Sequence, residues 1–439
     1  MNIHELLFSM PKSCPCGRAH VHTLKDILIG QGVVRQLPAL LGGLGASHPY
    51  VLTDQTTERV AGGAVCRILT DAGLSFVSHT LPSERPIPNE AFVGSAILHL
   101  DMTCDAIVAV GSGVVNDIAK IVSHTTGRPF IIVATAPSMD GYASDSSSME
   151  RDGLKVSVKS RCADVIIGDT DILSKAPERM LISGIGDMLA KYVSLCEWHI
   201  SHLVNGEYYC EYVASLVREA LKRCVEHADG LLRRDPRAIE AVFSGLVIGG
   251  VAMTYAGLSR PASGVEHYVS HILDMRGLSR GTPVDLHGIQ CAIGTRYALH
   301  VYDRLRKVRP DADKARRAVS AFDYAAHAEA LRAFIGEGAE AMIEGEKREK
   351  KYDPLKHERR LATLIDRWDD ILAIMGAELP SEGDLVAFLD RIGAPKSFSD
   401  IALPEGEVNT VLTMTKDIRD KYVLTSLLWD LGLTDELIG

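Results

Sequence analysis

The segment Ala106-Ile-Val-Ala-Val110-Gly111-Ser-Gly-Val-Val-Asn-Asp117 runs from five apolar residues through a glycine turn into a helical pattern. A short, continuous apolar run of this kind is typical of a strand that is buried on both faces. Gly111 and Gly113 permit a close backbone approach, and the following helix would present its N–H groups and positive dipole end to a phosphate. Asn116 stands where the dinucleotide fingerprint Gly-x-Gly-x-x-Gly has its third glycine, so an ordinary strand-to-helix turn stays open as an alternative.

Apolar runs of the same kind recur before about residue 170 and alternate with amphipathic helical patterns. The candidate strands are residues 27–30, 50–53, 76–80, 106–110, 130–134 and 165–167, and residues 57–72 and 89–100 fit helices between them. Continuous apolar strands separated by helices predict a parallel sheet covered on both faces. We therefore expect a doubly wound, Rossmann-like α/β domain whose ligands bind at the carboxyl ends of the strands.

Strand signals largely vanish after about residue 175, and long helical patterns follow over residues 176–202, 207–232 and 236–258 and on to the C-terminus. We predict a nucleotide-binding α/β domain over residues 1–175 and an all-helical, metal- and substrate-binding domain over residues 176–439. Residues 337–360 are dense in Glu, Lys and Arg, and this mixture of signs favours a solvated helix or connection over a nucleic-acid patch.

Composition excludes several classes of partner. The chain has 439 residues, and its 57 acidic and 47 basic side chains give a net charge of −10, which argues against nucleic acid or an anionic membrane surface as the main partner. The nine cysteines are an odd number and mostly lie in apolar segments, as in a reduced protein. No secretory signal and no apolar run of about 18 residues is visible. We expect a cytoplasmic protein with no transmembrane helix.

The segment Arg260-Pro-Ala-Ser-Gly-Val-Glu-His267-Tyr-Val-Ser-His271, followed by Leu286-His287-Gly288, carries the main chemical signal. His267 and His271 are four residues apart and share one face of a helix. Neutral imidazoles gathered in this way are the usual ligands of a divalent transition metal. Each histidine taken alone is more often an ordinary core or surface residue, so the set needs an anionic partner to indicate a metal site.

Asp187 is the candidate for that anion. It lies among Ile185, Met188 and Leu189, where a carboxylate is costly to bury unless it is paired or bound to a metal. A helical pair with Lys191 is the alternative. Asp187, His267 and His287 together would leave coordination positions open for substrate oxygens, and His271 would then contact the substrate as a hydrogen-bond or proton partner.

Other residues are candidates for ligand contacts. Arg260 offers the two parallel donors that suit a phosphate, although a solvated surface charge is the ordinary alternative. The loop over residues 134–149 is rich in Thr, Ser and Asp and follows a predicted strand, where it would grip a cofactor and a polyol or simply lie on the surface. Asp54 ends another strand, so its carboxylate would accept from ribose hydroxyls or cap the next helix.

A separate cluster, Cys14-Pro-Cys16-Gly-Arg-Ala-His20, holds three soft donors for zinc. No fourth donor is evident near it, and the usual two-residue spacer between the cysteines is absent. The sequence leaves its role open.

In this order, these residues resemble the sn-glycerol-1-phosphate dehydrogenase family, within the superfamily of metal-dependent alcohol dehydrogenases and dehydroquinate synthase-like enzymes. The resemblance extends from Tyr50-Val-Leu-Thr-Asp54 to Lys421-Tyr-Val-Leu-Thr-Ser-Leu-Leu-Trp-Asp-Leu-Gly432. The segment from Arg260 to His267 and the tail from Leu427 to Gly432 are typical of the bacterial branch. The Cys14 cluster belongs to no motif that the resemblance carries over.

The resemblance implies a dehydroquinate synthase-like fold, a homodimer and a part in phospholipid metabolism. It implies that NAD(P) is bound by Asp54, Gly113, Val114, Val115, Asn116, Asp117, Thr135, Ala136, Pro137, Ser138 and Ser144. It implies one divalent metal (Ni, Zn or Fe) held by Asp187, His267 and His287. It implies substrate contacts from Asp140, Asp187 and His271, of which Asp187 and His271 would be catalytic.

The expected reaction is the interconversion of dihydroxyacetone phosphate and sn-glycerol 1-phosphate. An acidic residue at position 54 disfavours a 2′-phosphate, which favours NAD(H) over NADP(H). The alternatives are glycerol dehydrogenase, another metal-dependent polyol dehydrogenase, or a dehydroquinate synthase-like cyclase. Against the cyclase, Gly264 stands where those enzymes commonly have asparagine, and Asp187 stands where they use glutamate. A catalytically silent nucleotide sensor is the alternative outside enzymes.

Overall fold

The computed structural model describes residues 3–8, 13–152 and 154–439. It divides into two compact units, which we describe one at a time. The first unit consists of residues 1–188 and 215–258, and the second of residues 189–214 and 259–439. The predicted boundary at residue 175 therefore differs from the observed division. Residues 176–188 and 215–258, which are largely helical, belong to the first unit.

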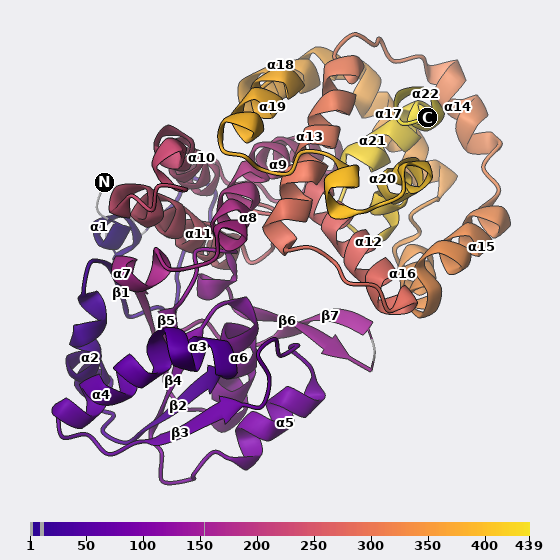
Figure 1. Cartoon of the computed structure of the whole chain (residues 1–439). Helices are drawn as coiled ribbons and strands as arrows, with labels where there is room; N and C mark the ends of the chain where they lie inside the picture. Colours follow the sequence, from indigo (N-terminus) through magenta and orange to yellow (C-terminus); the bar gives the residue numbers. More distant parts are fainter. Residues whose placement is uncertain (1–2, 9–12, 153) are drawn as a thin grey trace. The chain divides into compact units, whose positions relative to one another are not determined.

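The first unit is built on a six-stranded sheet in which every neighbouring pair is parallel, as predicted (Figure 1). The strands are β1 (Asp26–Gly30), β2 (Pro49–Asp54), β3 (Val77–Leu81), β4 (Ala106–Gly111), β5 (Phe130–Ala134) and β8 (Val165–Asp169). All six were predicted from the apolar runs. Every residue of β2, β4, β5 and β8 is buried, which explains why those runs show no alternation of apolar and polar residues.

The strand order is β1-β8-β5-β4-β2-β3. From β2 the chain moves outward to β3, returns to place β4 on the other side of β2, and then continues through β5 to β8. The direction of winding therefore reverses between β2 and β4. Open α/β sheets bind ligands in the crevice at the carboxyl ends of the strands at such a point.

Helices α2 (Leu37–Gly43), α4 (Gly63–Asp71), α5 (Glu90–Leu98) and α6 (Gly113–Thr126) connect these strands. A small antiparallel hairpin, β6 (Ser146–Arg151) with β7 (Leu154–Lys159), follows β5. The predicted polar loop over residues 134–149 overlaps the first four residues of this hairpin, and for residues 146–149 the prediction was wrong. Along β6, buried Ser147 and Met149 alternate with exposed Ser146 and Ser148, so three serines hid the two-residue period of a strand.

Helix α11 (Pro236–Ala256) shows why residues 215–258 join the first unit. It contacts β1, α7 (Thr170–Leu173) and the short turn Gly141–Ala143. It is long and apolar enough to cross a membrane, but 83% of its most apolar window is buried inside the protein. A helix that is apolar all round and covered by neighbours is typical of a protein core. The loop from Asp140 to Ala143 touches its backbone at Gly250, where a Cβ would lie 2.6 Å from the Asp140 carbonyl oxygen.

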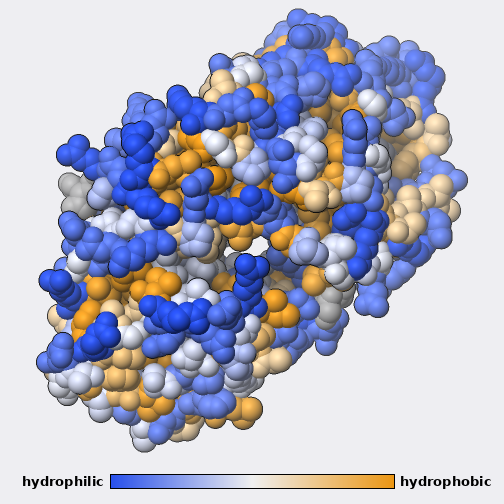
Figure 2. Space-filling model, viewed as in Figure 1, coloured by the Kyte–Doolittle hydropathy of each residue, from blue (hydrophilic) through white to orange (hydrophobic). Residues whose placement is uncertain are grey.

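The second unit is helical, as predicted: the described residues after 175 contain no strand. Its central helices are α9 (Lys191–Asn205), α12 (Val265–Arg280) and α13 (His287–Leu305), which contact one another. The later helices are α14 (Ala312–Ser320), α15 (Tyr324–Ile335), α16 (Ala339–Glu349), α17 (Pro354–Asp366), α18 (Trp368–Glu378), α19 (Glu382–Arg391), α20 (Val408–Met414), α21 (Leu424–Leu431) and α22 (Thr434–Leu437). Hydrophilic residues cover much of the surface in Figure 2, with smaller apolar areas among them.

Candidate metal centre and cofactor site

The predicted cofactor residues gather at one edge of the sheet. The strands β2, β4 and β5 end at Asp54, Gly111 and Ala134, and in the ladder Gly111 lies opposite Ala134. Asp54, the first turn of α6 and the segment beginning at Thr135 therefore share the carboxyl edge, beside the reversal of winding. Thr135 N–H donates to the Gly111 carbonyl at 3.0 Å, which joins the two segments directly.

The start of α6 has features that fit an anionic ligand. Ser112 makes no side-chain capping hydrogen bond, so the first N–H groups of this helix, Gly113 to Val115, have no side-chain cap. Asn116 is fully buried, and its Oδ1 has no hydrogen-bond partner among the described residues. An unsatisfied buried acceptor is costly, and a bound cofactor would remove that cost by donating to it. Gly111 has a packing role as well, since a Cβ there would lie 2.4 Å from the Val115 Cβ.

Lys120, which the sequence pattern did not single out, contacts the loop of predicted site residues. Its side chain is fully buried, and its Nζ donates to the Gly141 carbonyl, to Ser144 Oγ at 3.0 Å and to the Ser146 carbonyl at 3.0 Å. These hydrogen bonds connect the loop of predicted substrate and cofactor residues to α6. Desolvation lowers the pKa of Lys120. On the helical pattern alone this lysine reads as an ordinary polar-face residue.

Asp117 and Asp54 also have partners of their own. Asp117 Oδ2 accepts from Ser148 N–H at 3.2 Å, and burial raises the pKa of this carboxyl to about 6. Asp54 Oδ1 accepts from the N–H groups of Thr56 and Thr57 at 2.8 and 2.7 Å. The helix-capping alternative for Asp54 is thus observed, and a ribose contact would use its second oxygen.

The remaining cofactor residues form the link from β5 toward α8 (Glu178–Leu189). The Ala136 carbonyl accepts from Tyr142 Oη–H at 2.7 Å, and the Ser138 carbonyl accepts from Ser183 Oγ–H at 2.9 Å. Pro137 lies against Gly184 so closely that a Cβ on Gly184 would be 1.8 Å from the Pro137 carbonyl oxygen. Only glycine allows this approach.

That approach sets the position of Asp187, three residues after Gly184 on α8. Asp187 is fully buried, and its Oδ2 accepts from the Asp140 N–H at 2.9 Å. A carboxylate oxygen of Asp187 lies within 4.8 Å of a carboxylate oxygen of Asp140. The first unit therefore brings the predicted metal aspartate and the predicted substrate aspartate together, although they are 47 residues apart.

In the second unit, α12 presents His267 with a carboxylate behind it. Glu266 Oε1 lies 2.8 Å from His267 Nδ1 and also accepts from Gly264 N–H at 2.6 Å. Because Nδ1 faces this oxygen acceptor, the neutral imidazole carries its proton on Nδ1 and keeps its lone pair on Nε2. This carboxylate–histidine arrangement is the usual support of a metal-binding imidazole. A Cβ at Gly264 would lie 2.5 Å from Glu197 Oε2 and 2.7 Å from Glu266 Oε2, so a larger residue there would displace these two carboxyl groups.

His287, at the first turn of α13, has the same tautomer for a different reason. Its Nδ1 lies 2.8 Å from Ser270 Oγ, and that hydroxyl donates its only proton to Gln290 Oε1 at 2.6 Å. Ser270 can therefore only accept from His287, which leaves Nε2 of His287 with its lone pair. The amide nitrogen of Gln290 donates to the Asp285 carbonyl at 3.1 Å, and this bond fixes the orientation of the amide.

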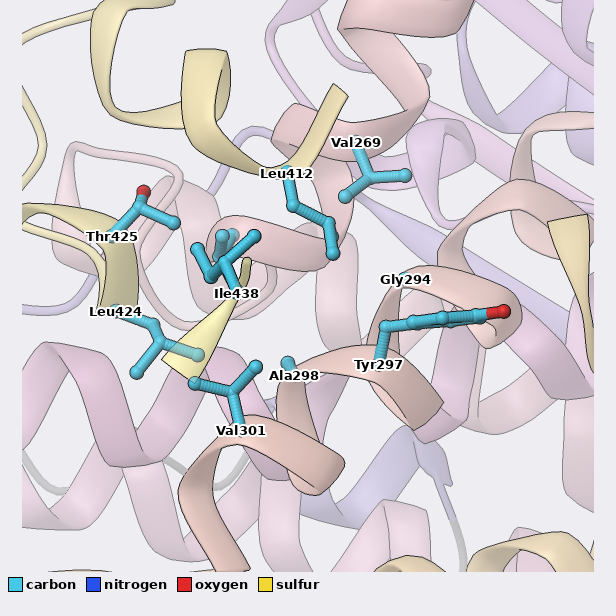
Figure 3. Close-up of a pocket in the computed structure, with 10 residues that line it drawn as sticks. Val269, Gly294, Tyr297, Ala298, Val301, Leu412, Leu424, Thr425 and Ile438 are labelled. Atoms are coloured by element: carbon cyan, nitrogen blue, oxygen red, sulfur yellow. The ribbon is translucent and has the colours of Figure 1, made fainter. Parts of the chain in front are cut away.

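The rings of His267 and His287 have centroids 4.9 Å apart and an interplanar angle of 65°. This proximity is helped by Gly294, where a Cβ would lie 2.9 Å from the Glu266 carbonyl oxygen, so the backbones of α12 and α13 approach each other directly. Away from the histidines, Val269 of α12 and Ala298 and Val301 of α13 line an apolar pocket (Figure 3). The donor set fits a divalent transition metal, because both imidazoles are held with Nε2 unprotonated.

Two further side chains lie beside this pair. The centroid of the His271 ring is 6.4 Å from that of His287, so His271 lies beside the predicted ligand. Cys291 Sγ lies 3.6 Å from His287 Nε2, and ligand atoms of Cys291, His267 and His287 fall within 4.8 Å of one another. Cys291 was not predicted, although its position one helical turn after His287 places the two side chains on one face of the helix.

Arg260 differs from its prediction as an anion clamp. Only 1% of its side chain is exposed, and its guanidinium makes a bidentate pair with Glu207, with its Nη2 2.7 Å from Glu207 Oε2. Nη1 donates to the Tyr422 carbonyl at 2.9 Å, and Nη2 also donates to Ser201 Oγ at 3.2 Å. The guanidinium is therefore occupied by internal partners. Glu207 is 53 residues away in sequence, so local pattern could not reveal it.

Part of the sequence matches a known family, and the fold resembles that of solved structures. The sequence profile of the family described as iron-containing alcohol dehydrogenase matches residues 28–177. A crystal structure of a probable glycerol dehydrogenase from Sinorhizobium meliloti 1021 has a TM-score of 0.60 at 16% identity, covering 94% of this chain and 96% of that one. The chain therefore has the fold of this structure, and part of its sequence matches the iron-containing alcohol dehydrogenase profile.

Curated relatives narrow the class. A glycerol-1-phosphate dehydrogenase (NAD(P)+) of Halalkalibacterium halodurans is 29% identical over 94% of both chains. One of Methanosarcina mazei is 36% identical, over 63% of this chain and 76% of its own length. The chain belongs to the glycerol-1-phosphate dehydrogenase family, as the sequence resemblance predicted.

Proposed function

We propose that this protein is a metal-dependent NAD(P) oxidoreductase that interconverts dihydroxyacetone phosphate and sn-glycerol 1-phosphate. The observation that carries the proposal is the pair His267 and His287, each held with Nε2 unprotonated by its own partner, in a chain of this family. Each neutral imidazole can therefore offer the lone pair of Nε2 to a metal ion. A protein that only binds nucleotide would not need this arrangement.

The metal would be held by Asp187, His267 and His287. When bound, a divalent ion supplies Lewis-acid stabilisation of the negative charge that develops on the carbonyl oxygen during reduction. Nickel, zinc and iron all accept this donor set. Glu266 and Ser270 keep the two imidazoles in the ligating tautomer, and Asp187 is oriented by the Asp140 N–H.

His271 and Asp140 are the substrate contacts of the proposal. His271 is four residues after His267 and supplies the proton that the C2 oxygen takes up in the reducing direction. Asp140 accepts hydrogen bonds from the hydroxyl groups of the triose. Because the Arg260 guanidinium is occupied by Glu207 and Tyr422, we assign it to holding the second unit together instead of to the phosphate.

The nicotinamide cofactor would lie along the carboxyl edge of the sheet and supply or take the hydride at C2. Asp54 would contact the ribose, which favours NAD(H) over NADP(H). The pyrophosphate would meet the N–H groups at the start of α6, from Gly113 to Asp117. Thr135 to Ser138, with Ser144, would line the other side of the cofactor.

Three wider expectations belong to the same proposal. The family resemblance implies a homodimer and a part in phospholipid metabolism. The nine cysteines, none of which forms a disulfide, support a reducing cytoplasmic location. The acidic net charge supports a small molecule as the partner instead of nucleic acid or a membrane surface.

The direct test is oxidation of NADH with dihydroxyacetone phosphate after loading the protein with nickel or zinc, followed by chiral analysis of the product. We expect sn-glycerol 1-phosphate, and loss of both metal and turnover in the His267→Ala variant. His300→Ala, an exposed histidine on the same helix as His287, is the matched control. Faster turnover of unphosphorylated dihydroxyacetone would instead establish a polyol dehydrogenase. Turnover of a sugar-acid phosphate without net change in NADH would establish a cyclase.

A further inference from the structure

The cluster at Cys14, Cys16 and His20 is built on a tight turn. Gly17 N–H donates to the Cys14 carbonyl at 2.9 Å, and Gly17 has φ of +79°, a conformation that favours glycine. Pro15 occupies the second position of the turn, where its fixed φ is favoured. This turn brings the thiols of Cys14 and Cys16 close together, although a single residue separates them.

His20 is prepared as a ligand by a contact inside the first unit. It is 7% exposed, and its Nδ1 lies 3.2 Å from the Tyr255 carbonyl oxygen. A carbonyl only accepts, so Nδ1 carries the proton and Nε2 keeps its lone pair. Nε2 then lies 3.4 Å from Cys16 Sγ. Backbone carbonyls are common partners of metal-binding histidines for this reason.

The same helix end holds the rest of the segment. Arg18 Nη1 donates to the Ala256 carbonyl at 3.3 Å, one residue after the carbonyl that orients His20, at the last residue of α11. The side chains of Arg18 and His20 are thus both hydrogen-bonded to the C-terminal turn of α11. The turn and the histidine are thereby held in place relative to each other before any ligand binds.

The distances fit a zinc ion. Zinc–sulfur and zinc–nitrogen bonds of about 2.3 and 2.0 Å at a tetrahedral angle separate the two ligand atoms by about 3.5 Å. The observed Cys16–His20 separation is 3.4 Å, and ligand atoms of all three residues lie within 4.8 Å of one another. A set of two thiolates and one imidazole binds zinc in preference to harder cations.

We propose that Cys14, Cys16 and His20 form a second metal site that binds Zn²⁺ through two thiolates and Nε2, with the fourth position taken by water or by a donor outside this segment. The site uses none of the residues assigned to the dehydrogenase reaction. Zinc binding releases the two thiol protons and cross-links the N-terminal segment next to the end of α11. Its role is to stabilise the first unit, without a part in hydride transfer.

The test counts zinc in the full chain after the proposed catalytic site has been disabled. In a His267→Ala/His287→Ala background we expect one zinc per chain by mass spectrometry after dialysis against a weak chelator. Adding Cys14→Ser and Cys16→Ser should remove it, while Cys66→Ser, another half-buried cysteine of the first unit, should leave it. Absence of zinc from the starting background, or its retention without both thiols, would overturn the proposal.

A second pair of variants guards against a fold defect. His20→Cys replaces one soft ligand by another and should retain zinc, and after cobalt loading its near-ultraviolet thiolate charge-transfer band should strengthen. His20→Asn should weaken zinc affinity by about 100-fold in a chelator competition, since one ligand bond is lost. Equal zinc affinity in these two variants, with circular dichroism unchanged in both, would contradict ligation by His20.

Discussion

Oγ of Ser270 lies 2.8 Å from Nδ1 of His287, on the neighbouring helix. Because this hydroxyl donates its proton to Gln290, it decides which nitrogen of His287 is available for a metal. The tautomer of a proposed metal ligand is thus set by a residue that binds neither metal nor substrate.

Replacing Ser270 by alanine should lower metal affinity by about 10- to 100-fold, the usual effect of removing a partner behind a metal-binding histidine. The overall structure should be preserved, because the change removes a single oxygen atom. Competition with a chromogenic chelator measures the affinity, and circular dichroism monitors the fold. Ser426→Ala, which removes a buried hydroxyl that has no hydrogen-bond partner among the described residues, is the control. Equal affinity in Ser270→Ala and the unmodified protein would refute this role.

Replacing Gly184 by alanine should destabilise the protein by about 1–3 kcal/mol, since a Cβ would overlap the Pro137 carbonyl oxygen at 1.8 Å. The same displacement should disturb the bond between Asp187 and Asp140 and reduce metal affinity. Gly376→Ala is the matched control. A Cβ there meets no atom within 4 Å, and the exchange should stabilise α18 by about 0.5–1 kcal/mol. Urea unfolding curves measure both changes, and a neutral Gly184→Ala variant would contradict the close approach.

Glu197 predicts a pH dependence of stability. Burial, followed by the negative charge of Glu266, raises the pKa of Glu197 from 4.5 to about 8. The folded protein therefore holds a proton that the unfolded chain releases near pH 4.5. The contribution of this group to the free energy of unfolding is complete below that pH. It falls as pH rises toward 8, by at most about 1.4 kcal/mol per pH unit.

The decline in melting temperature between about pH 5 and pH 8 should accordingly be smaller in Glu197→Gln than in the unmodified protein. Differential scanning fluorimetry across a buffer series gives this slope, with chelator present so that metal binding does not contribute. Glu84→Gln, in an ion pair that is 62–66% exposed, should leave the slope unchanged. Identical slopes for Glu197→Gln and the unmodified protein would show that Glu197 ionises normally.

Arg260→Lys distinguishes an internal ion pair from a phosphate clamp. Loss of the bidentate bonds to Glu207 should lower the free energy of unfolding by about 3 kcal/mol, at the lower end for a broken buried pair because Glu207 is 26% exposed. The KM for dihydroxyacetone phosphate should change little in the folded fraction. Glu207→Gln should have a similar effect on unfolding. A large rise in KM with unchanged stability would return Arg260 to the phosphate.

Much of the fold could be predicted because it depends on local patterns. The six parallel strands followed from continuous apolar runs, and the later helices from apolar residues at helical spacing. The hairpin at residues 146–159 was missed because serine occupies both buried and exposed positions in β6, which hides the alternation of a strand. The division into units also departed from the prediction, since α11 packs against β1 far from it in sequence.

The chemical residues divide in the same way. The sequence by itself determined the family and the sheet, and it singled out the two histidines proposed for the metal, because these follow from residue type and spacing. Only the tertiary structure decided how those residues are prepared: Glu266 and Ser270 set the tautomers, Lys120 fastens the ligand loop, and Glu207 occupies Arg260. Tautomers and ion pairs depend on distances of a few ångströms between segments that are far apart in the chain. Those distances are set by the packing of the whole core, which no local pattern of residues records.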